Sequence, residues 1–272
     1  MGYDISYHPI TETEINQWYW GLDFTRIIEG DYTAVDELAR QHGIEDFYRQ
    51  KYAELLDVAV NTQPDNAFEN THGYYIAVIQ GLFRKYFYTR GSAFSFLMLE
   101  KPDFRKYTKV WEDVLSSKAE NKIHNQLKSN YSSGVFIPAD QVVQLLNDYQ
   151  HDTRVKQHLD DFYSEKRINV FVKALTFAAE NNCGLLEASD VVEPNPLDLD
   201  KSVCYSDLLN CDIEGALLYQ EVAREQLKEI EQRENLPEGH IERNSTYQVN
   251  NIAPVNEPVI EKKGFFQRLF GK

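Results

Sequence analysis

The sequence predicts an α+β fold that is predominantly helical with a few short strands. Most apolar residues recur every three or four positions, as on the buried side of a helix, and only a few short runs alternate or stay apolar as strands do. Of the 272 residues, 42% are hydrophobic and 26% are charged. This composition is ordinary for a folded globular protein and argues against a fibre or a disordered chain.

The sequence predicts a strand at the start of the chain, followed mainly by helices. Alternating residues 3–8 predict a strand that ends at Pro9, and Thr11 with Glu14 form a capping-box pattern that starts a helix. Apolar periodicity predicts further helices at 33–42, 45–61, 69–89, 92–99, 102–115, 139–150, 152–164, 167–182 and 213–234. Two more short strands or extended segments are expected at 135–137 and 185–192.

Composition also predicts the domain layout. Residues 1–235 are expected to form one globular unit, with a subdivision considered at the polar stretch 129–134. Residues 236–262 are rich in Asn, Pro and Glu with little periodicity, which predicts a flexible linker. Residues 263–272 end the chain as an amphipathic aromatic tail peptide.

The net charge of −15 is unevenly placed. Residues 187–242 hold 15 acidic and 4 basic residues, whereas residues 84–128 hold 10 basic and 5 acidic ones. The acidic stretch is either a solvated face that serves solubility or a surface that steers a basic protein partner. The overall charge argues against a chain-wide attraction to nucleic acid.

The sequence lacks the motifs of several common classes of functional site. The cysteines are Cys183, Cys204 and Cys211, too few and too unevenly spaced for a disulfide framework, so a reducing cytoplasm is expected. No zinc, nucleotide-binding or nucleophile-elbow motif occurs, and neither a metal nor a cofactor is predicted. The longest apolar stretch, 73–83, is interrupted by Gln80 and is far shorter than the roughly 20 residues of a membrane span.

The opening strand gives the one catalytic hypothesis. Asp4, Ser6 and His8 share a strand face and are the residue types of a nucleophilic triad. Neighbours on one extended strand are expected to lie too far apart to relay a proton. The favoured interpretation is a partly solvated face on which His8 and Asp4 bond to loop backbone; a cleft completed by distant residues is the alternative.

Two groups of residues are candidates for partner binding. The first is a set of four acidic residues, Asp198, Asp200, Asp207 and Asp212. The second is the apolar side of the tail, formed by Phe265, Phe266, Leu269 and Phe270. The tail has the design of a short anchor that could dock in a partner's groove, lie at a membrane surface, or fold back on its own domain.

Together these features favour a non-enzymatic cytoplasmic protein-binding module that contacts a partner with a basic surface. An inhibitor or an immunity-type protein is one form of such a module, because covering a basic active site requires an acidic surface and no catalytic machinery. The alternative is a small-molecule hydrolase with a cleft near Asp4 and His8.

Overall fold

The computed structural model describes residues 3–61, 68–115, 126–127 and 130–244. Helices dominate and a small mixed sheet lies among them, so the predicted α+β class is confirmed. Residues Met1–Arg224 form one compact unit and Glu225–Lys272 form a second. The tail residues Phe265, Phe266, Leu269 and Phe270 lie outside the described residues.

A five-stranded sheet organises the first unit. Its strands in spatial order are β3 (Ser133–Ile137), β4 (Gly184–Ser189), β1 (Asp4–Ile10), β2 (Tyr86–Arg90) and β7 (Cys211–Asp212). All neighbours pair antiparallel except β2 and β7, which pair parallel. The opening strand is therefore the middle of the sheet. The predicted segment 135–137 falls within β3, and the predicted segment 185–192 is correct only as far as Ser189, where β4 ends. Val192 belongs to β5 (Val192–Glu193), which pairs with β6 (Val203–Cys204) in a separate two-stranded sheet.

The expectation that Pro9 ends the first strand is wrong. Strand β1 continues to Ile10, with Pro9 opposite Leu185 of β4. Pairing with β2 ends at Tyr7, which lies opposite Phe87. Pro9 therefore has a strand partner on one side only, the situation in which a missing backbone N–H is tolerated.

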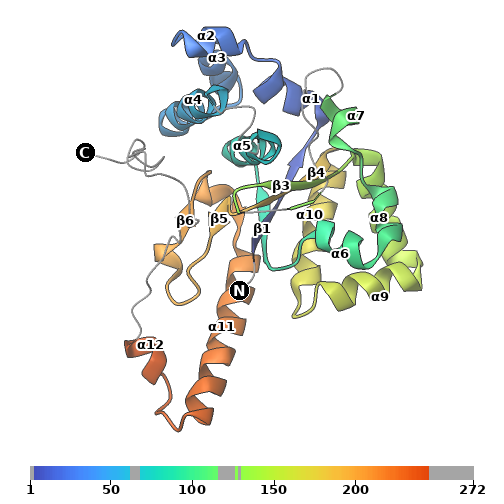
Figure 1. Ribbon diagram of the computed structural model, residues 1–272, viewed down its shortest axis with the longest axis vertical. Coiled ribbons are helices and arrows are strands. Elements are labelled where there is room, and N and C mark those ends of the chain that lie inside the picture. The colour runs from blue at the N-terminus through green and yellow to red at the C-terminus, as the bar shows by residue number, and fades with distance from the viewer. Residues whose placement is uncertain (1–2, 62–67, 116–125, 128–129, 245–272) are drawn as a thin grey trace, which may run out of the picture. The chain divides into compact units, whose positions relative to one another are not determined.

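Helices cover both faces of this sheet (Figure 1). On one face lies α5 (Phe68–Phe83), which packs on β1, β3 and β4 and in turn contacts α4 (Asp46–Val60). The other face is covered by α10 (Arg167–Glu180) and by α8 (Ala139–His151), which packs against both α10 and β4. Ile5 and Tyr7 of β1 point into the core on the α10 side, where the Tyr7 ring contacts Phe171.

The helix predicted at 69–89 is only partly correct. Helix α5 ends at Phe83, and Tyr86–Arg90 form strand β2. Phe87 continued the helical spacing, but its segment is also rich in aromatic residues, which favour strands. Pairing with β1 and β7 decides between these two local preferences.

The remaining elements complete the two units. They are α1 (Glu12–Ile15), the π-helical η1 (Asn16–Trp20), α2 (Phe24–Ile28), α3 (Thr33–Gln41), α6 (Phe94–Glu100), η2 (Pro102–Tyr107), α7 (Trp111–Leu115), α9 (Thr153–Phe162), β5 (Val192–Glu193), η3 (Leu199–Lys201), β6 (Val203–Cys204), η4 (Leu208–Asn210), α11 (Ile213–Arg233) and α12 (His240–Asn244). The continuous helix expected at 102–115 is instead a 3₁₀ turn followed by a short α-helix.

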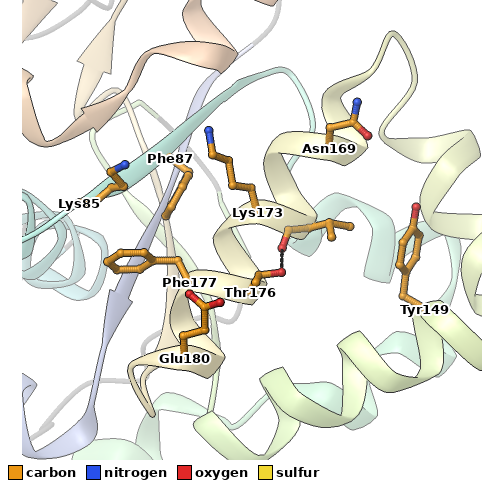
Figure 2. A pocket seen from close by; sticks show the side chains of 9 residues that line it. Lys85, Phe87, Tyr149, Asn169, Lys173, Thr176, Phe177 and Glu180 are labelled. Atoms are coloured by element: carbon orange, nitrogen blue, oxygen red, sulfur yellow. Dashed lines mark hydrogen bonds between the residues drawn. The ribbon is translucent and has the colours of Figure 1, made fainter.

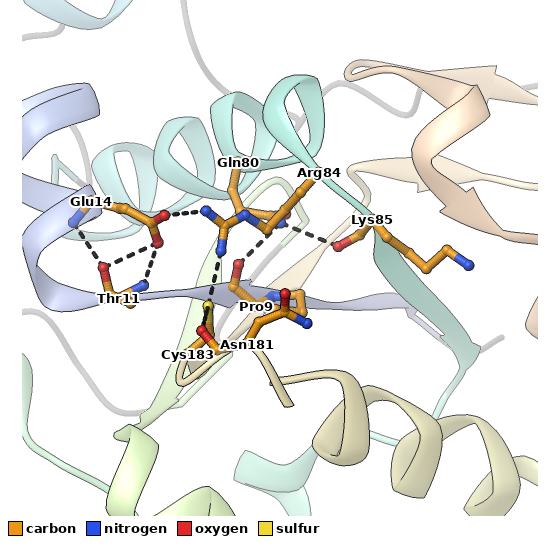
Figure 3. Close-up of polar contacts among 8 residues, drawn as sticks. All are labelled: Pro9, Thr11, Glu14, Gln80, Arg84, Lys85, Asn181 and Cys183. Carbon is orange, nitrogen blue, oxygen red and sulfur yellow. Dashed lines mark hydrogen bonds and ion pairs between the residues drawn. The ribbon is translucent and has the colours of Figure 1, made fainter. Parts of the chain in front are cut away.

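The capping box predicted at Thr11 is present and extends into a larger network. Thr11 accepts from the Glu14 backbone, and the Glu14 carboxylate accepts from the Thr11 backbone N–H at 2.9 Å. Glu14 also forms an ion pair with Arg84, whose guanidinium donates to the Cys183 sulfur at 2.9 Å (Figure 3). These contacts join the start of α1 to the end of α5 and to the residue before β4.

A short helix lies inside the segment predicted to be a linker. In the second unit, the Glu231 carboxylate accepts from the backbone N–H groups of Gly239 and Ile241, both at 2.7 Å. Helix α12 (His240–Asn244) begins at this contact. The lack of apolar periodicity concealed it, because the helix is a single turn held by a side chain from α11.

Candidate functional site

The structure brings Ser6 and His8 into direct contact, which the strand geometry alone did not predict. His8 Nε2 lies 2.8 Å from Ser6 Oγ, and both side chains are completely buried. The imidazole is long enough to bridge the separation between alternate residues of a strand. The predicted partly solvated face is wrong for Ser6 and His8, which α5 covers, and His8 bonds to side chains rather than to loop backbone. The Asp4 side chain stays 15% exposed.

Gln80 of α5 fixes the tautomer of His8. The Gln80 amide nitrogen donates to Pro9 O at 3.2 Å and to Lys85 O at 3.3 Å (Figure 3), so its oxygen is the atom that faces His8 Nδ1 at 2.7 Å. His8 Nδ1 therefore carries the proton, and Nε2 accepts from the Ser6 hydroxyl. Burial lowers the pKa of His8 to about 3, against the smaller raising effect of the Gln80 bond.

Asp4 takes no part in this pair. Its carboxylate forms an ion pair with Arg90 at 2.5 Å and accepts from the Tyr88 hydroxyl at 2.7 Å. Ser6, His8 and Gln80 have the order of a nucleophile, a base and an orienting group, but none of the three is exposed. The three side chains therefore form a buried polar clamp that joins β1 to α5. Because none of them has accessible surface, a substrate atom could not reach them.

Two of the four acidic candidates lie at the surface, and two are covered by other residues. Asp198 caps η3 and pairs with Lys201 at 2.8 Å, and Asp200 in the same turn is exposed. Asp207 is largely buried and caps η4 by accepting from Leu209 N at 2.9 Å. Asp212 is only 7% exposed and accepts from Lys173 at 2.8 Å. Asp207 and Asp212 therefore hold the fold together, and Asp198 and Asp200 remain at the surface.

The same part of the chain exposes large apolar side chains that the sequence did not single out. Leu208, Leu209, Ile213 and Leu217 are 47%, 88%, 59% and 48% exposed. Ile213 and Leu217 lie one turn apart on the same side of α11, and the two leucines form η4 just before them. We call these four residues the exposed apolar segment.

Hydrogen bonds to α5 hold this segment in place. The Ser206 hydroxyl donates to Val78 O at 2.6 Å, and the Asn210 amide donates to Gly81 O at 2.9 Å. Lys51 of α4 donates to Ser206 O at 2.8 Å. The apolar side chains are thus presented by an anchored turn. The sequence carried one signal of this: two adjacent leucines directly after a capping Asp, outside any helical stripe.

A groove of about 560 Å³ runs along α10 and is lined by Lys85, Phe87, Lys173 and Phe177 among others (Figure 2). Its two lysines both face Asp212, with Nζ to Oδ2 distances of 3.6 Å for Lys85 and 2.8 Å for Lys173. Since the protein's own carboxylate already pairs with these cations, the groove is a poor anion site.

A buried carboxyl group on the α10 side of the sheet is a further feature that the sequence pattern did not predict. Glu187 of β4 is completely buried and accepts from the Ser95 backbone N–H at 3.1 Å. Burial raises its pKa to about 7, and hydrogen bonds from Ser95, Phe94 and Val135 only partly offset this. A glutamate inside the apolar run of β4 was the available signal. With no exposed surface, Glu187 is a titratable core group rather than a ligand site.

Comparison with known protein families, with curated proteins and with solved structures finds no match for this chain. Within the described residues, no helix is both long and apolar enough to cross a membrane. In the same residues, no group of three or more His, Cys, Asp or Glu side chains is arranged to hold a metal ion.

Proposed function

We propose that this chain is a non-catalytic protein-binding module whose contact surface is the exposed apolar segment, Leu208, Leu209, Ile213 and Leu217, with acidic residues around it. Four large aliphatic side chains are exposed within the ten residues 208–217, and this exposure is the observation that supports the proposal. The turn that presents the first two of them is hydrogen-bonded to α5 through Ser206 and Asn210. Several large apolar side chains exposed close together in the chain are a feature of interaction sites. Because the turn is already held by α5, binding would cost little conformational entropy.

Charge supports a basic partner. Asp198 and Asp200 precede the exposed apolar segment, and Glu214 and Glu221 lie on α11 with half-exposed side chains. Asp198, Glu214 and Glu221 pair with Lys201, Lys173 and Lys166, but these are solvent-exposed ion pairs of low stability that a basic partner can replace. An apolar centre with an acidic rim complements a partner segment that has an apolar face flanked by Lys or Arg. The carboxylates would then mainly raise the association rate, and the apolar contacts would mainly set the dissociation rate.

An inhibitor or immunity-type role is the specific form that we favour, because such a protein covers a basic surface without performing chemistry itself. The predicted cytoplasmic location is part of this proposal. A contact of the tail residues Phe265, Phe266, Leu269 and Phe270 with the partner or with a membrane surface stays a prediction.

Affinity purification with the full chain tests the proposal. Wild type, Leu209→Ser and Val143→Ser are used as bait at low and at high salt, and the retained proteins are identified. Val143, on α8, is 54% exposed and is a matched control for loss of an exposed aliphatic side chain. We expect a protein with a basic surface that wild type and Val143→Ser retain, that Leu209→Ser loses, and that high salt weakens.

Retention of the same proteins by wild type and Leu209→Ser would overturn the proposed surface. Release that is insensitive to salt would contradict the acidic rim specifically. In that case Asp198→Asn with Asp200→Asn would leave the association rate unchanged, whereas the proposal requires that rate to fall and to lose salt dependence.

A further inference from the structure

An exposed aromatic side chain on α4 is connected to the turn that presents the exposed apolar segment. Phe47, in the first turn of α4, is 62% exposed. Its ring contacts the Tyr48 ring at a centroid distance of 5.1 Å, and the Lys51 ammonium lies 6.0 Å from the centroid of the same Tyr48 ring. Lys51 Nζ donates to Ser206 O at 2.8 Å, two residues before Leu208. A continuous series of contacts therefore joins Phe47 to this turn.

The exposed apolar side chains on this surface come from helices and a turn. Phe47 is on α4, Leu208 and Leu209 are on η4, and Ile213 and Leu217 are on α11. Strand β7 lies between η4 and α11 in the chain, but its two residues are too few for a partner's strand to pair with it. The surface therefore suits a partner that contacts it with side chains and satisfies its own backbone hydrogen bonds internally, as an α-helix does.

Acidic side chains flank Phe47 in the same way as they flank the exposed apolar segment. Glu45 and Asp46 directly precede Phe47, and both are exposed. Asp46 pairs with Arg49 at 3.2 Å, but Arg49 also pairs with Asp36 at 2.9 Å, so one base is shared between two carboxylates. The side chain of Asp46 is 93% exposed, and an ion pair at such a position is weak. This part of α4 therefore also complements a partner with basic residues beside its apolar side.

We propose that the partner binds as a basic amphipathic α-helix that lies across Phe47 and the exposed apolar segment. This inference rests on the proposed function and specifies the form of the partner. Apolar side chains spaced three or four residues apart on the partner helix would contact Phe47, Leu209 and their aliphatic neighbours. Lys or Arg side chains along the edges of the same helix would face Glu45, Asp46 and Asp200.

Two synthetic peptides of identical Leu and Lys composition, each about 14 residues long, test this form. One places Leu at helical spacing, and the other alternates Leu with Lys as a strand would. Binding of each to the purified full chain is measured by fluorescence anisotropy at low and at high salt. Because the two peptides carry the same charge, non-specific attraction to an acidic protein contributes equally to both. We expect the peptide with helical spacing to bind at least about tenfold more tightly and to gain helical circular dichroism on binding.

Variants locate the contact on the protein. Phe47→Ser and Leu209→Ser should each weaken binding of the peptide with helical spacing at least about tenfold, because each removes an exposed side chain that the peptide would bury. Val143→Ser, the matched control on α8, should bind it as wild type does. All three substitutions are at exposed positions, so unchanged unfolding midpoints should show that the fold is intact.

The helix inference and the proposed function fail in different experiments. The inference is overturned if neither peptide binds, if the alternating peptide binds as tightly, or if Phe47→Ser binds the peptide with helical spacing as tightly as wild type. A basic protein that Leu209→Ser still loses in affinity purification would then leave the proposed function intact. Retention of the same proteins by wild type and Leu209→Ser is instead the result that contradicts the proposed function.

Discussion

Replacing Glu187 by Gln should remove a pH-dependent component of stability that the buried carboxyl group creates. Burial raises its pKa from the ordinary 4.5 to about 7. Between these values the folded state keeps the proton that the unfolded state has lost, so raising the pH destabilises the folded state. The contribution is fully present below about pH 4.5 and is lost as the pH rises through about 7. At about 1.36 kcal/mol per pKa unit, the loss approaches roughly 3 kcal/mol.

The assay is urea unfolding of wild type and Glu187→Gln at a series of pH values from about 4.5 to about 8. Contributions from other titrating groups are shared by both proteins and cancel in the difference. We expect the stability of wild type relative to the variant to fall by about 3 kcal/mol across this range. Glu100→Gln, at an exposed position of α6, is the control for loss of one charge. A difference between wild type and Glu187→Gln that stays constant with pH would contradict the raised pKa of Glu187.

Three further predictions concern the fold. Burial lowers the pKa of His8 to about 3, so its imidazole should stay neutral, with the proton on Nδ1, down to about pH 5. NMR can measure this, and titration of His8 near pH 6.5 would contradict the buried clamp. As the pH falls below the ordinary 6.5, the unfolded chain alone gains this proton and stability drops. Gly215→Ala should lower the free energy of unfolding by about 1–3 kcal/mol, because the added Cβ would strike the Tyr88 carbonyl oxygen. An unchanged midpoint of chemical denaturation would show that α11 lies farther from β2. Asp212→Asn should cost about 1–2 kcal/mol, since it weakens charged bonds to half-exposed lysines such as Lys173, and a neutral result would mean that solvent replaces them.

The sequence identified most helices because apolar periodicity directly reports the side that faces a core. The predicted helices at 139–150, 152–164 and 167–182 correspond closely to α8, α9 and α10. Strand β2 was missed because Phe83 and Phe87 keep helical spacing, and only pairing with strands distant in sequence separates helix from strand there.

The candidate site was harder to predict, for physical reasons that particular residues illustrate. Ser6 and His8 are polar and lie opposite apolar residues of the strand, so alternation indicated an exposed face; Gln80, 72 residues later, supplies the polar partner that permits burial. Asp212 was expected at a partner surface, but Lys173 and Lys85 cover it. Leu209 is apolar yet exposed, and local pattern cannot distinguish an apolar residue in the core from one at an interaction surface.

Binding of a basic partner by the exposed apolar segment can be measured as the dissociation constant of the purified partner. Leu209→Ser combined with Ile213→Ser removes two exposed side chains, so folding stability should change by less than about 0.5 kcal/mol per site. Burying each aliphatic side chain at an interface contributes about 1.5–3 kcal/mol. We expect the double variant to bind at least about a hundredfold more weakly than wild type, with Val143→Ser unchanged. Equal affinity of the double variant and wild type would contradict binding at this segment.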